Sequence, residues 1–311
     1  MTLGLITLIL SSFLIFKFNK KFLSKNIIDE INDRSSHKTK ATRSGGIAVF
    51  SSLFIISCFN YFNSIEIFDY SFLIPISLML VVGLYDDIYK LDFKLKFIFQ
   101  IIAAKIIIDN GLIIDNFHGF MGVYELSRIV AQIITIFAVV GIINAINFID
   151  GIDGLAISIA ILFFSFFEFF AKYQTSFSSL SFIIIFSLIP LYYFNYKKKN
   201  KVFLGDSGSL FLGTLISIFV LNILSDEYLI KNRFDLNKII FVISILFYPF
   251  IDLVRVVFIR LKNGKSPFDA DQNHIHHLLL SYYKKHWIVV VIIVLGSFLM
   301  VCFSQLLLRT A

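Results

Sequence analysis

Two adjacent aspartates near the end of an apolar segment could carry out metal-dependent chemistry. Asp86 and Asp87 are followed by Lys94, seven residues after the second aspartate. Neighbouring carboxylates do not share one helical face, so the pair suits a helix end or a turn where both can reach one metal ion or its water. Mg²⁺ prefers carboxylate and phosphate oxygens, and a lysine can neutralise phosphate. Because Asp-Asp also occurs in many capped turns, the pair alone is weak evidence.

The segment from Asn144 to Leu155 is a more specific signal. Asn144 and Asn147 lie one helical turn apart, on one face of a helix end. Asp150-Gly and Asp153-Gly then form a tight double turn, where glycine permits a positive φ. This segment contains no Lys or Arg, so the partner of its carboxylates is a metal ion, a ligand or a distant cation. Turn formation explains the glycines but not the two asparagines, which favours a functional interpretation.

Two further segments could bind a cation and an anion. Asp206 lies in Gly-Asp-Ser-Gly-Ser-Leu, after a lysine-rich stretch, at the start of an apolar segment. It could simply cap a helix, but a carboxylate at a helix N-terminus stays ionised and can coordinate a cation. Arg43 precedes Ser-Gly-Gly at another apolar segment. A cation beside accessible backbone N–H groups suits phosphate, although a topological signal would explain Arg43 equally well.

A histidine cluster, His274-Ile275-His276-His277, lies in the longest polar stretch. Such a cluster can chelate Zn²⁺, but no Cys or Glu on this stretch completes a tetrahedral set. Beside a phosphate site, the histidines suit charge stabilisation, hydrogen bonding or proton transfer near pH 7. In the preceding apolar segment, Asp252 and Arg255 are three residues apart. We expect them to pair across one helical turn in a structural role.

The elements that position these residues are apolar helices. The chain has 311 residues, of which 58% are hydrophobic, and its mean hydropathy is +0.84. Apolar stretches of sufficient length to cross a bilayer predict an all-α integral membrane protein, with residues 1–311 forming a single polytopic domain. The expected spans are 2–18, 46–62, 68–84, 96–109, 127–144, 155–171, 178–194, 208–224, 238–258 and 287–308.

The distribution of positive charge predicts the orientation in the membrane. Ten spans place loops 19–45, 85–96, 145–154, 195–207 and 259–286 on one side, and these loops carry most of the 28 lysines and arginines. By the positive-inside rule this side is cytoplasmic, with both termini outside. All of the motifs lie on it, which predicts an active site at the cytoplasmic face of the membrane. The net charge of +7 follows from this bias and does not require a nucleic-acid partner. A basic face attracts membrane lipids and phosphate substrates instead.

These motifs together resemble a known family. N-x-x-N-x-x-D-G-x-D-G-L with G-D-x-G-S-L is very specific in combination, and the histidine cluster follows Ser266-Pro267-Phe268. Over nearly its whole length the chain resembles the polyprenyl-phosphate N-acetylhexosamine-1-phosphate transferases, which include the enzymes that start O-antigen and teichoic acid synthesis. The phospho-MurNAc-pentapeptide transferases, a related branch, typically carry three consecutive histidines. Ile275 interrupts that run here, so the chain looks more like the O-antigen-initiating branch.

The resemblance implies transfer of a sugar-1-phosphate from a UDP-N-acetyl sugar to undecaprenyl phosphate, with release of UMP. It implies a need for Mg²⁺, for which Mn²⁺ could substitute, and it is compatible with a homodimer. The identity of the sugar stays open. Site residues carried over by motif are Asp86, Asp87, Asp150, Asp153 and His274 for catalysis, Arg43, Lys94, Asn144, Phe268, His276 and His277 for substrate binding, and Asn147 and Asp206 for the metal.

Two other classes of membrane protein are alternatives. A secondary transporter would place its charged site near the bilayer midplane, often with internal repeats, whereas these motifs are interfacial and show no repeat. The CDP-alcohol phosphatidyltransferases carry a longer aspartate signature than the run from Asp150 to Ile157. For the transferase itself, we prefer a single displacement to a covalent aspartyl intermediate. A phosphate monoester is largely dianionic at pH 7, so a strong base is not obligatory.

Overall fold

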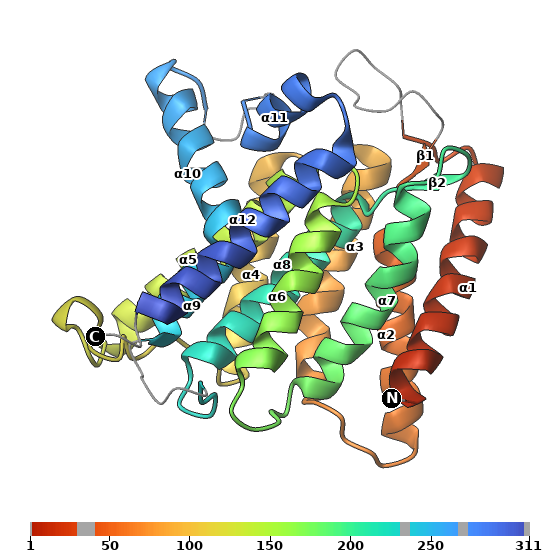
Figure 1. Ribbon diagram of the computed structural model, residues 1–311. Coiled ribbons are helices and arrows are strands. Elements are labelled where there is room, and N and C mark those ends of the chain that lie inside the picture. Colours follow the sequence, from red (N-terminus) through yellow and green to blue (C-terminus); the bar gives the residue numbers. More distant parts are fainter. Residues whose placement is uncertain (1, 30–40, 231–236, 267–272, 308–311) are drawn as a thin grey trace.

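The helices pack against one another as one bundle. The computed structural model describes residues 2–29, 41–230, 237–266 and 273–307, so the predicted substrate-binding residue Phe268 lies outside the described residues. Its helices are α1 (Thr2–Ser24), α2 (Gly45–Phe62), α3 (Leu73–Tyr89), α4 (Phe93–Asp109), α5 (Arg128–Ile149), α6 (Leu155–Phe170), α7 (Ser178–Asn195), α8 (Gly205–Leu224), α9 (Asn237–Ile245), α10 (Phe247–Lys262), α11 (Ile275–Tyr283) and α12 (His286–Leu307). Two 3-10 turns, η1 (Tyr70–Phe72) and η2 (Phe120–Gly122), and two short strands, β1 (Ala41–Thr42) and β2 (Lys201–Val202), complete the arrangement shown in Figure 1.

The predicted all-α membrane class is confirmed by these helices. In the described part of the chain, seven helices are long and apolar enough to cross a bilayer, and the count is eight if the pair α9 and α10, which is bent by 69°, forms one broken span. The predicted span 238–258 is therefore broken rather than continuous. At 17 and 16 residues, α4 and α6 are shorter than an 18-residue span, so the count of ten spans stays a prediction.

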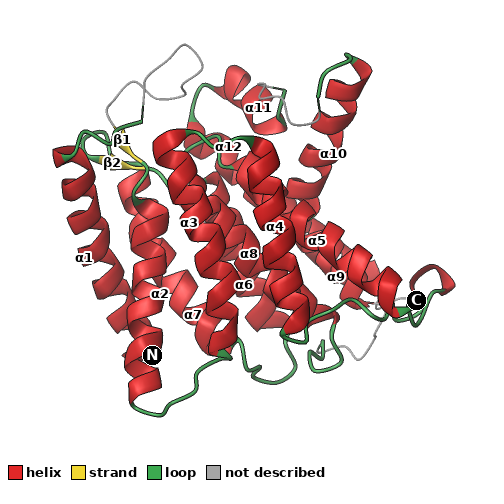
Figure 2. Cartoon of the chain, turned by 180° about the vertical axis from the view of Figure 1, so that it is seen from behind, coloured by secondary structure: helices red, strands yellow, loops and turns green. Residues whose placement is uncertain are grey.

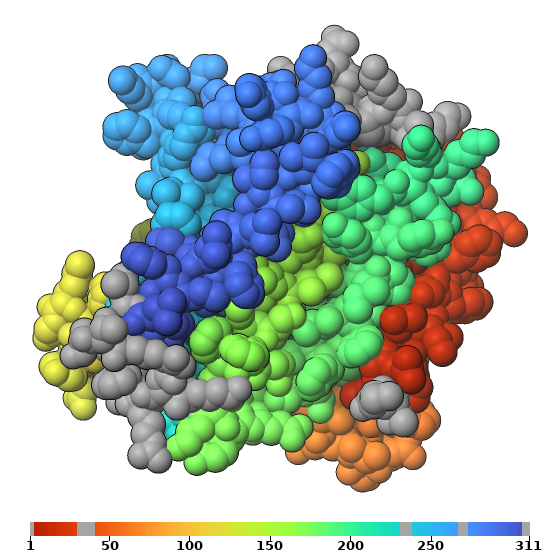
Figure 3. Space-filling view, in the orientation of Figure 1, coloured from red at the N-terminus to blue at the C-terminus, as the bar shows by residue number. Residues whose placement is uncertain are grey.

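The outer surface of the bundle is apolar, as a lipid-facing surface must be. On the face shown in Figure 3, α12 crosses the bundle in front of α6, and its residues Leu299 and Phe303 are more than half exposed. Exposed aromatic and aliphatic side chains also line α1, including Ile9 and Phe16. Contiguous exposed apolar surface of this kind marks a membrane-facing region rather than a water-facing one.

The ends of the bundle differ. The strands β1 and β2 and the helix α11 lie at one end, and α1 begins at the opposite end (Figures 1 and 2). The two strands pair in parallel, with Ala41 opposite Lys201 and Thr42 opposite Val202. This pairing joins the segment before α2 to the segment before α8, so the Arg43 loop and the Asp206 turn become neighbours. The sequence motifs therefore converge on one end of the molecule.

The centre of the bundle is α8, whose membrane-length window is entirely buried. It packs against α2 and α3 through glycines, which allow helix backbones to approach closely. A Cβ atom on Gly83 would lie 2.3 Å from the carbonyl oxygen of Asp206, and one on Gly46 would lie 2.2 Å from the amide nitrogen of Gly208. The first turn of α8, which carries Asp206, is thus held directly against the ends of two other helices.

Replacement of Gly83 by alanine is expected to destabilise the protein. The added methyl would have to displace the backbone of α8, because the contact is with main-chain atoms, and overpacking typically costs about 1–3 kcal/mol. The measurement is the thermal midpoint in detergent, together with activity. Gly141→Ala is the matched control, since that glycine is also within a helix but a Cβ there meets nothing within 4 Å. Equal midpoints for the two variants would contradict the close packing of α3 on α8.

Candidate active site

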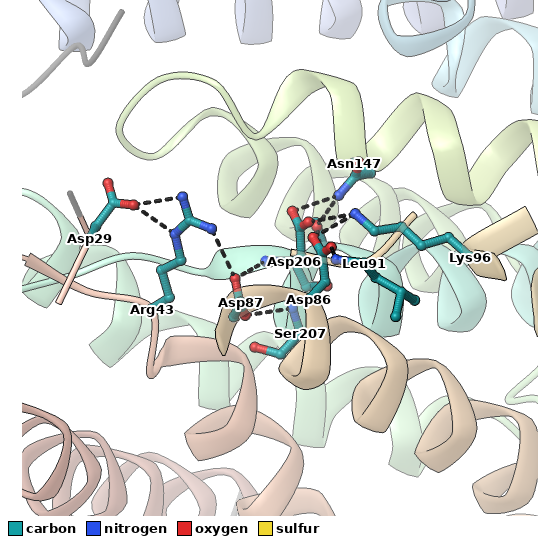
Figure 4. A network of polar contacts seen from close by, with 10 residues as sticks. Asp29, Arg43, Asp86, Asp87, Leu91, Lys96, Asn147, Asp206 and Ser207 are labelled. Carbon is teal, nitrogen blue, oxygen red and sulfur yellow. Dashed lines mark hydrogen bonds and ion pairs between the residues drawn. The ribbon is translucent and has the colours of Figure 1, made fainter. Parts of the chain in front are cut away.

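One lysine joins two of the predicted aspartates. Lys96 on α4 places its Nζ 2.5 Å from Asp86 Oδ2 on α3 and 2.9 Å from Asp206 Oδ2 on α8 (Figure 4). Asn147 on α5 donates through Nδ2 to Asp206 Oδ1 at 3.1 Å and to Ser209 Oγ at 2.8 Å. Four helices therefore contribute to a compact polar cluster: α3, α4 and α5 supply one side chain each, and α8 supplies two. Its two carboxylates converge on a single cationic atom.

The adjacent aspartates have different partners. Asp87 has a fully buried side chain, and its two oxygens accept the backbone N–H groups of Asp206 and Ser207, each at 2.9 Å. It thereby satisfies amides at the start of α8, which helix geometry leaves without internal partners. Asp86 instead accepts the N–H of Leu91 at 2.6 Å, besides its contact with Lys96. Asp86 faces the cluster, whereas Asp87 anchors α8 to α3.

Arg43 lies on the other side of Asp87. Its guanidinium contacts Asp29 Oδ1 at 2.6 Å and Asp87 Oδ1 at 3.5 Å, and its side chain is 38% exposed. The same residues, with Lys90, line a cavity of about 150 Å³. Arg43 is therefore a partly accessible cation next to the cluster, in a position consistent with its predicted contact with a phosphate.

The partners of Asp153 are a lysine and a histidine from distant segments of the chain. Its Oδ2 lies 2.6 Å from Lys201 Nζ on β2 and 3.0 Å from His286 Nδ1 on α12, and its backbone carbonyl accepts the hydroxyl of Tyr196 at 2.8 Å. Burial opposes ionisation, but the hydrogen bonds from His286 and Lys201 hold the pKa of Asp153 below its usual range. The structure therefore gives Asp153 a role in holding the Asp150–Gly154 turn to its neighbours.

Asp150 has a different environment from Asp153. Burial raises its pKa well above the usual range, and the nearby carboxylates of Asp206 and Asp87 raise it further, while Arg43 acts in the opposite direction. Burial and neighbouring like charges are the effects that raise the pKa of catalytic carboxylates. Of the two aspartates in this turn, Asp150 is electrostatically coupled to the Asp206 cluster and retains a proton more readily.

The histidine cluster is organised by α10. Asp252 accepts the Nδ1–H of His274 at 2.7 Å and the backbone N–H of Ile275 at 2.7 Å. The predicted pair between Asp252 and Arg255 is wrong, because the buried carboxylate contacts this distant segment and Arg255 donates to the backbone carbonyl of Asn273. A histidine and an amide that approach from another segment satisfy a buried carboxylate better than a neighbour on the same helix surface.

The histidine cluster also contacts the aspartate turn. His276 is completely buried, and its Nδ1 lies 3.0 Å from the hydroxyl of Tyr248. A Cβ atom on Gly151 would lie 2.6 Å from His276 Nε2 and 3.1 Å from His277 Nε2. Only a glycine leaves room for both rings at this position. The Asp150–Gly154 turn and the histidines, more than 120 positions apart in the sequence, form one wall of the site.

The structure places the remaining predicted residues as follows. Asn144 exchanges hydrogen bonds with Gln100 on α4, with Nδ2 donating to Gln100 Oε1 at 2.7 Å, one turn away from Asn147. Lys94 is exposed and contributes its backbone N–H to Asp92 at 3.0 Å. Its predicted contact with substrate stays a prediction. The lysine that forms ion pairs with Asp86 and Asp206 is Lys96.

Lys96 and Asp252 are functional candidates that the sequence analysis missed. Lys96 and Gln100 are four residues apart, so they share one face of α4, and the buried Gln100 could have identified that face. No comparable signal connects Asp252 with the histidines, because they are separated by more than twenty residues and meet only through the tertiary fold.

Two groups of residues could hold a metal ion. Among the described residues, one set of three histidine, cysteine or carboxylate side chains has its ligand atoms within 4.8 Å of one another. This set is Asp252, His274 and His276. Asp86 and Asp206 form a second set, with one oxygen of each next to Lys96 Nζ, and the other oxygen of Asp206 accepts from the amide of Asn147. Mg²⁺ is bound through one or two carboxylates together with substrate phosphates, so the second set fits the expected metal better.

Comparison with known proteins identifies the family. The family model described as glycosyl transferase family 4 matches residues 70–224, a range that contains Asp86, Asp87, Asn147 and Asp206. The undecaprenyl-phosphate alpha-N-acetylglucosaminyl 1-phosphate transferase of Pasteurella multocida is 33% identical, over 90% of this chain and 79% of that protein. The probable undecaprenyl-phosphate N-acetylglucosaminyl 1-phosphate transferase of Bacillus subtilis is 31% identical, over 91% of this chain and 78% of that protein.

The match is also found at lower identity in another bacterium. The undecaprenyl-phosphate alpha-N-acetylglucosaminyl 1-phosphate transferase of Escherichia coli (strain K12) is 27% identical, over 89% of this chain and 75% of that protein. Alignments of this length include the aspartate motifs and the helices that position them. The family expected from the motifs is confirmed: this chain belongs to glycosyl transferase family 4, the family of the polyprenyl-phosphate N-acetylhexosamine-1-phosphate transferases.

Proposed function

We propose that this protein transfers N-acetylhexosamine-1-phosphate from a UDP-linked donor to undecaprenyl phosphate. The observation that carries the proposal is the convergence of Asp86 and Asp206 on the single cation of Lys96, at the end of the bundle where all of the motifs meet. The names of the relatives support undecaprenyl phosphate as the acceptor and favour N-acetylglucosamine as the sugar. The product, undecaprenyl-diphosphate-sugar, would start a cell-surface polysaccharide such as O-antigen.

The reaction forms one bond and breaks one. An oxygen of undecaprenyl phosphate attacks the β-phosphorus of the UDP-sugar, and the bond from that phosphorus to the bridging oxygen breaks as UMP leaves. Phosphoryl transfer of this type depends on in-line positioning and charge neutralisation more than on covalent chemistry. Two cations supply positive charge here: Arg43 lies next to Asp87, and Lys96 lies next to Asp86. Asp86 would orient the acceptor phosphate or remove its residual proton.

A divalent cation fits the same cluster. Asp206 and Asn147 would hold Mg²⁺, with Mn²⁺ as a substitute, and the ion would neutralise the diphosphate and stabilise the departing UMP. Asp206 is well placed for this role because its two oxygens already contact a cation and an amide. Asp87 and Asp153 would act by holding the first turn of α8 and the Asp150–Gly154 turn in place.

Purified protein tests this function directly. In detergent or nanodiscs it is incubated with undecaprenyl phosphate and UDP-GlcNAc, UDP-GalNAc or their deoxy analogues, and UMP is measured with Mg²⁺ and with EDTA. We expect UMP only when acceptor, UDP-GlcNAc and Mg²⁺ are all present. Absence of UMP with every UDP-N-acetyl sugar would disprove the proposal. A phospho-enzyme trapped from donor alone would disprove the single displacement.

The localisation follows from the membrane class. The protein is a multi-pass membrane protein, and we place it in the bacterial inner membrane with the motif end at the cytoplasmic face, because UDP-sugars are cytoplasmic and lysines and arginines concentrate in the motif loops. Cysteine labelling of Lys198→Cys and Ser64→Cys variants, at opposite ends of the bundle, checks the orientation. An impermeant reagent applied to intact cells should label the second variant only.

The raised pKa of Asp150 predicts a pH dependence. A carboxyl group with a raised pKa keeps its proton to higher pH, so a reaction that needs its carboxylate speeds up as pH rises through that pKa. We expect kcat/KM to rise with pH as Asp150 loses its proton, at a higher pH than for an ordinary aspartate. The acceptor phosphate also titrates, near pH 6. The variant Asp150→Asn separates the two titrations. A rise in the pH profile that is due to Asp150 disappears in this variant, whereas a rise that is due to the phosphate persists.

A further inference from the structure

Two residues of α10 contact the histidines through their side chains. Tyr248 and Asp252 are four positions apart and thus on one helical face, at the beginning of the helix that follows the 69° bend. Tyr248 contacts His276 at 3.0 Å and Asp252 contacts His274 at 2.7 Å. The rings of the two histidines are stacked, with centroids 5.3 Å apart. The helix that follows the bend therefore places one hydrogen-bond partner beside each histidine ring.

These contacts leave one ring nitrogen without a partner. His276 Nε2 is buried and makes no hydrogen bond in the described part of the chain, and it faces the Gly151 position of the aspartate turn. Burial and the neighbouring His277 lower the pKa of His276 to about 3, so the ring is neutral at pH 7. A buried polar atom without a hydrogen bond destabilises the protein. A bound ligand that forms this hydrogen bond removes the cost.

The tautomer of His276 follows from its partner. If Nδ1 carried the proton and donated to Tyr248, the tyrosine hydroxyl would need another acceptor. The acceptor that the structure places beside that hydroxyl is His276 Nδ1, at 3.0 Å. With Tyr248 as donor, both atoms are satisfied and Nε2 carries the proton. The second nitrogen of an imidazole is set in this way by the hydrogen bond that the first one makes.

We propose that Tyr248 and Asp252 are positioning residues, which fix the rings of His276 and His274 against the Asp150–Gly154 turn so that His276 presents a neutral Nε2–H to an acceptor oxygen of the nucleotide sugar. This inference rests on the proposed function for the identity of the ligand. The completely buried carboxylate of Asp252 supports it, because burying a charge is costly and well-packed apolar residues often stabilise a core as well as a buried ionic group does.

A metal site is the competing explanation for the same residues. Two ligands of one tetrahedral zinc ion at about 2 Å would lie about 3 Å or more apart, whereas Asp252 Oδ2 and His274 Nδ1 are separated by a hydrogen-bond distance of 2.7 Å. His276 Nδ1, the atom 4.0 Å from Asp252, is already paired with Tyr248. The contacts therefore favour hydrogen-bonded rings over a chelate.

Two pairs of variants test the inference. Tyr248→Phe is compared with Tyr228→Phe, which removes another buried hydroxyl, one that donates to the carbonyl of Phe167 at 2.8 Å. Asp252→Asn is compared with Glu168→Gln, where the carboxylate accepts from Ser181. We expect kcat to fall about 10-fold in Tyr248→Phe and about 100-fold in Asp252→Asn. The two control variants should stay within about twofold of the parent protein, since each loses only a neutral or structural hydrogen bond.

Several readouts separate positioning from folding. Thermal midpoints should fall equally in Tyr248→Phe and Tyr228→Phe, while kcat falls in the first alone. Binding of UDP and of UDP-GlcNAc by each variant shows which oxygen meets Nε2: weakening of both points to the diphosphate, and weakening of UDP-GlcNAc alone points to the sugar. Unchanged kcat and unchanged binding in Tyr248→Phe would overturn the inference. So would one equivalent of zinc in the purified protein that is lost in Asp252→Asn.

The failure of this inference is distinguishable from failure of the proposed function. If the parent protein releases no UMP with any acceptor and donor, the proposed function is wrong. If the parent protein is active and the α10 variants match their controls, the function stands and the positioning role is wrong.

Discussion

Replacement of Asp206 by asparagine is expected to lower kcat for UMP release by about 10³-fold, with retention of the fold. Asp206 lies in the first turn of α8. Its Oδ2 is 2.9 Å from Lys96 Nζ on α4, and its Oδ1 is 3.1 Å from Asn147 Nδ2 on α5. The amide keeps the shape of the side chain but removes the negative charge that would hold Mg²⁺. The concentration of Mg²⁺ for half-maximal activity should therefore rise as kcat falls.

The matched control for this variant is Asp69→Asn. Asp69 accepts a hydrogen bond from the backbone N–H of Ser71 in the turn before α3, and it is exposed at the other end of the bundle. The chemical change is the same, but we expect activity within about twofold of the parent protein, as is usual for surface substitutions. Equal activity of Asp206→Asn and the parent at limiting Mg²⁺ would contradict the assignment of Asp206 to the metal.

Helix position and motif chemistry explain why much of the fold was predictable. Long apolar stretches predict membrane helices from length alone, and the motifs placed Asp206 and Asn147 near each other before any distance was known. The break near Leu246 was not predictable in this way. It lies inside a continuous apolar stretch, so the hydropathy pattern carries no sign of it. Pro249, in the first turn of α10, is the local signal that could have located the break, because a proline cannot continue a helix through the residue four positions before it, here Ile245 at the end of α9.

The parts of the site that the sequence did not reveal share a physical reason. A side chain's partner depends on which helices pack together, and one polar residue in an apolar helix has many candidate partners. Asp252 has Arg255 one turn away yet contacts His274 instead. Asp153 has no cation in its own loop and pairs with Lys201 and His286 from two other segments. Local spacing predicted the residue types of the site, whereas tertiary packing determined their pairing.

Replacement of Lys96 by methionine is expected to lower kcat/KM by about 100-fold. Its Nζ lies between Asp86 and Asp206, and methionine keeps the length of the side chain without the charge. The two carboxylates would then face each other uncompensated, and a group that can neutralise phosphate would be lost. Hydrogen bonds that involve charged groups contribute about 1.5–3 kcal/mol each, which matches a loss of this size. The measurement is UMP release across concentrations of both substrates.

Lys105→Met provides the control, because Lys105 is on the same helix in an exposed ion pair with Asp109 and such pairs contribute little. Lys94→Met compares two ways of finding the functional lysine. The family resemblance selects Lys94 by its position after the aspartate pair, and the contacts select Lys96. A larger loss in Lys94→Met than in Lys96→Met would mean that Lys96 only balances charge in the absence of substrate, and that the cation which meets the phosphates comes from the exposed first turn of α4.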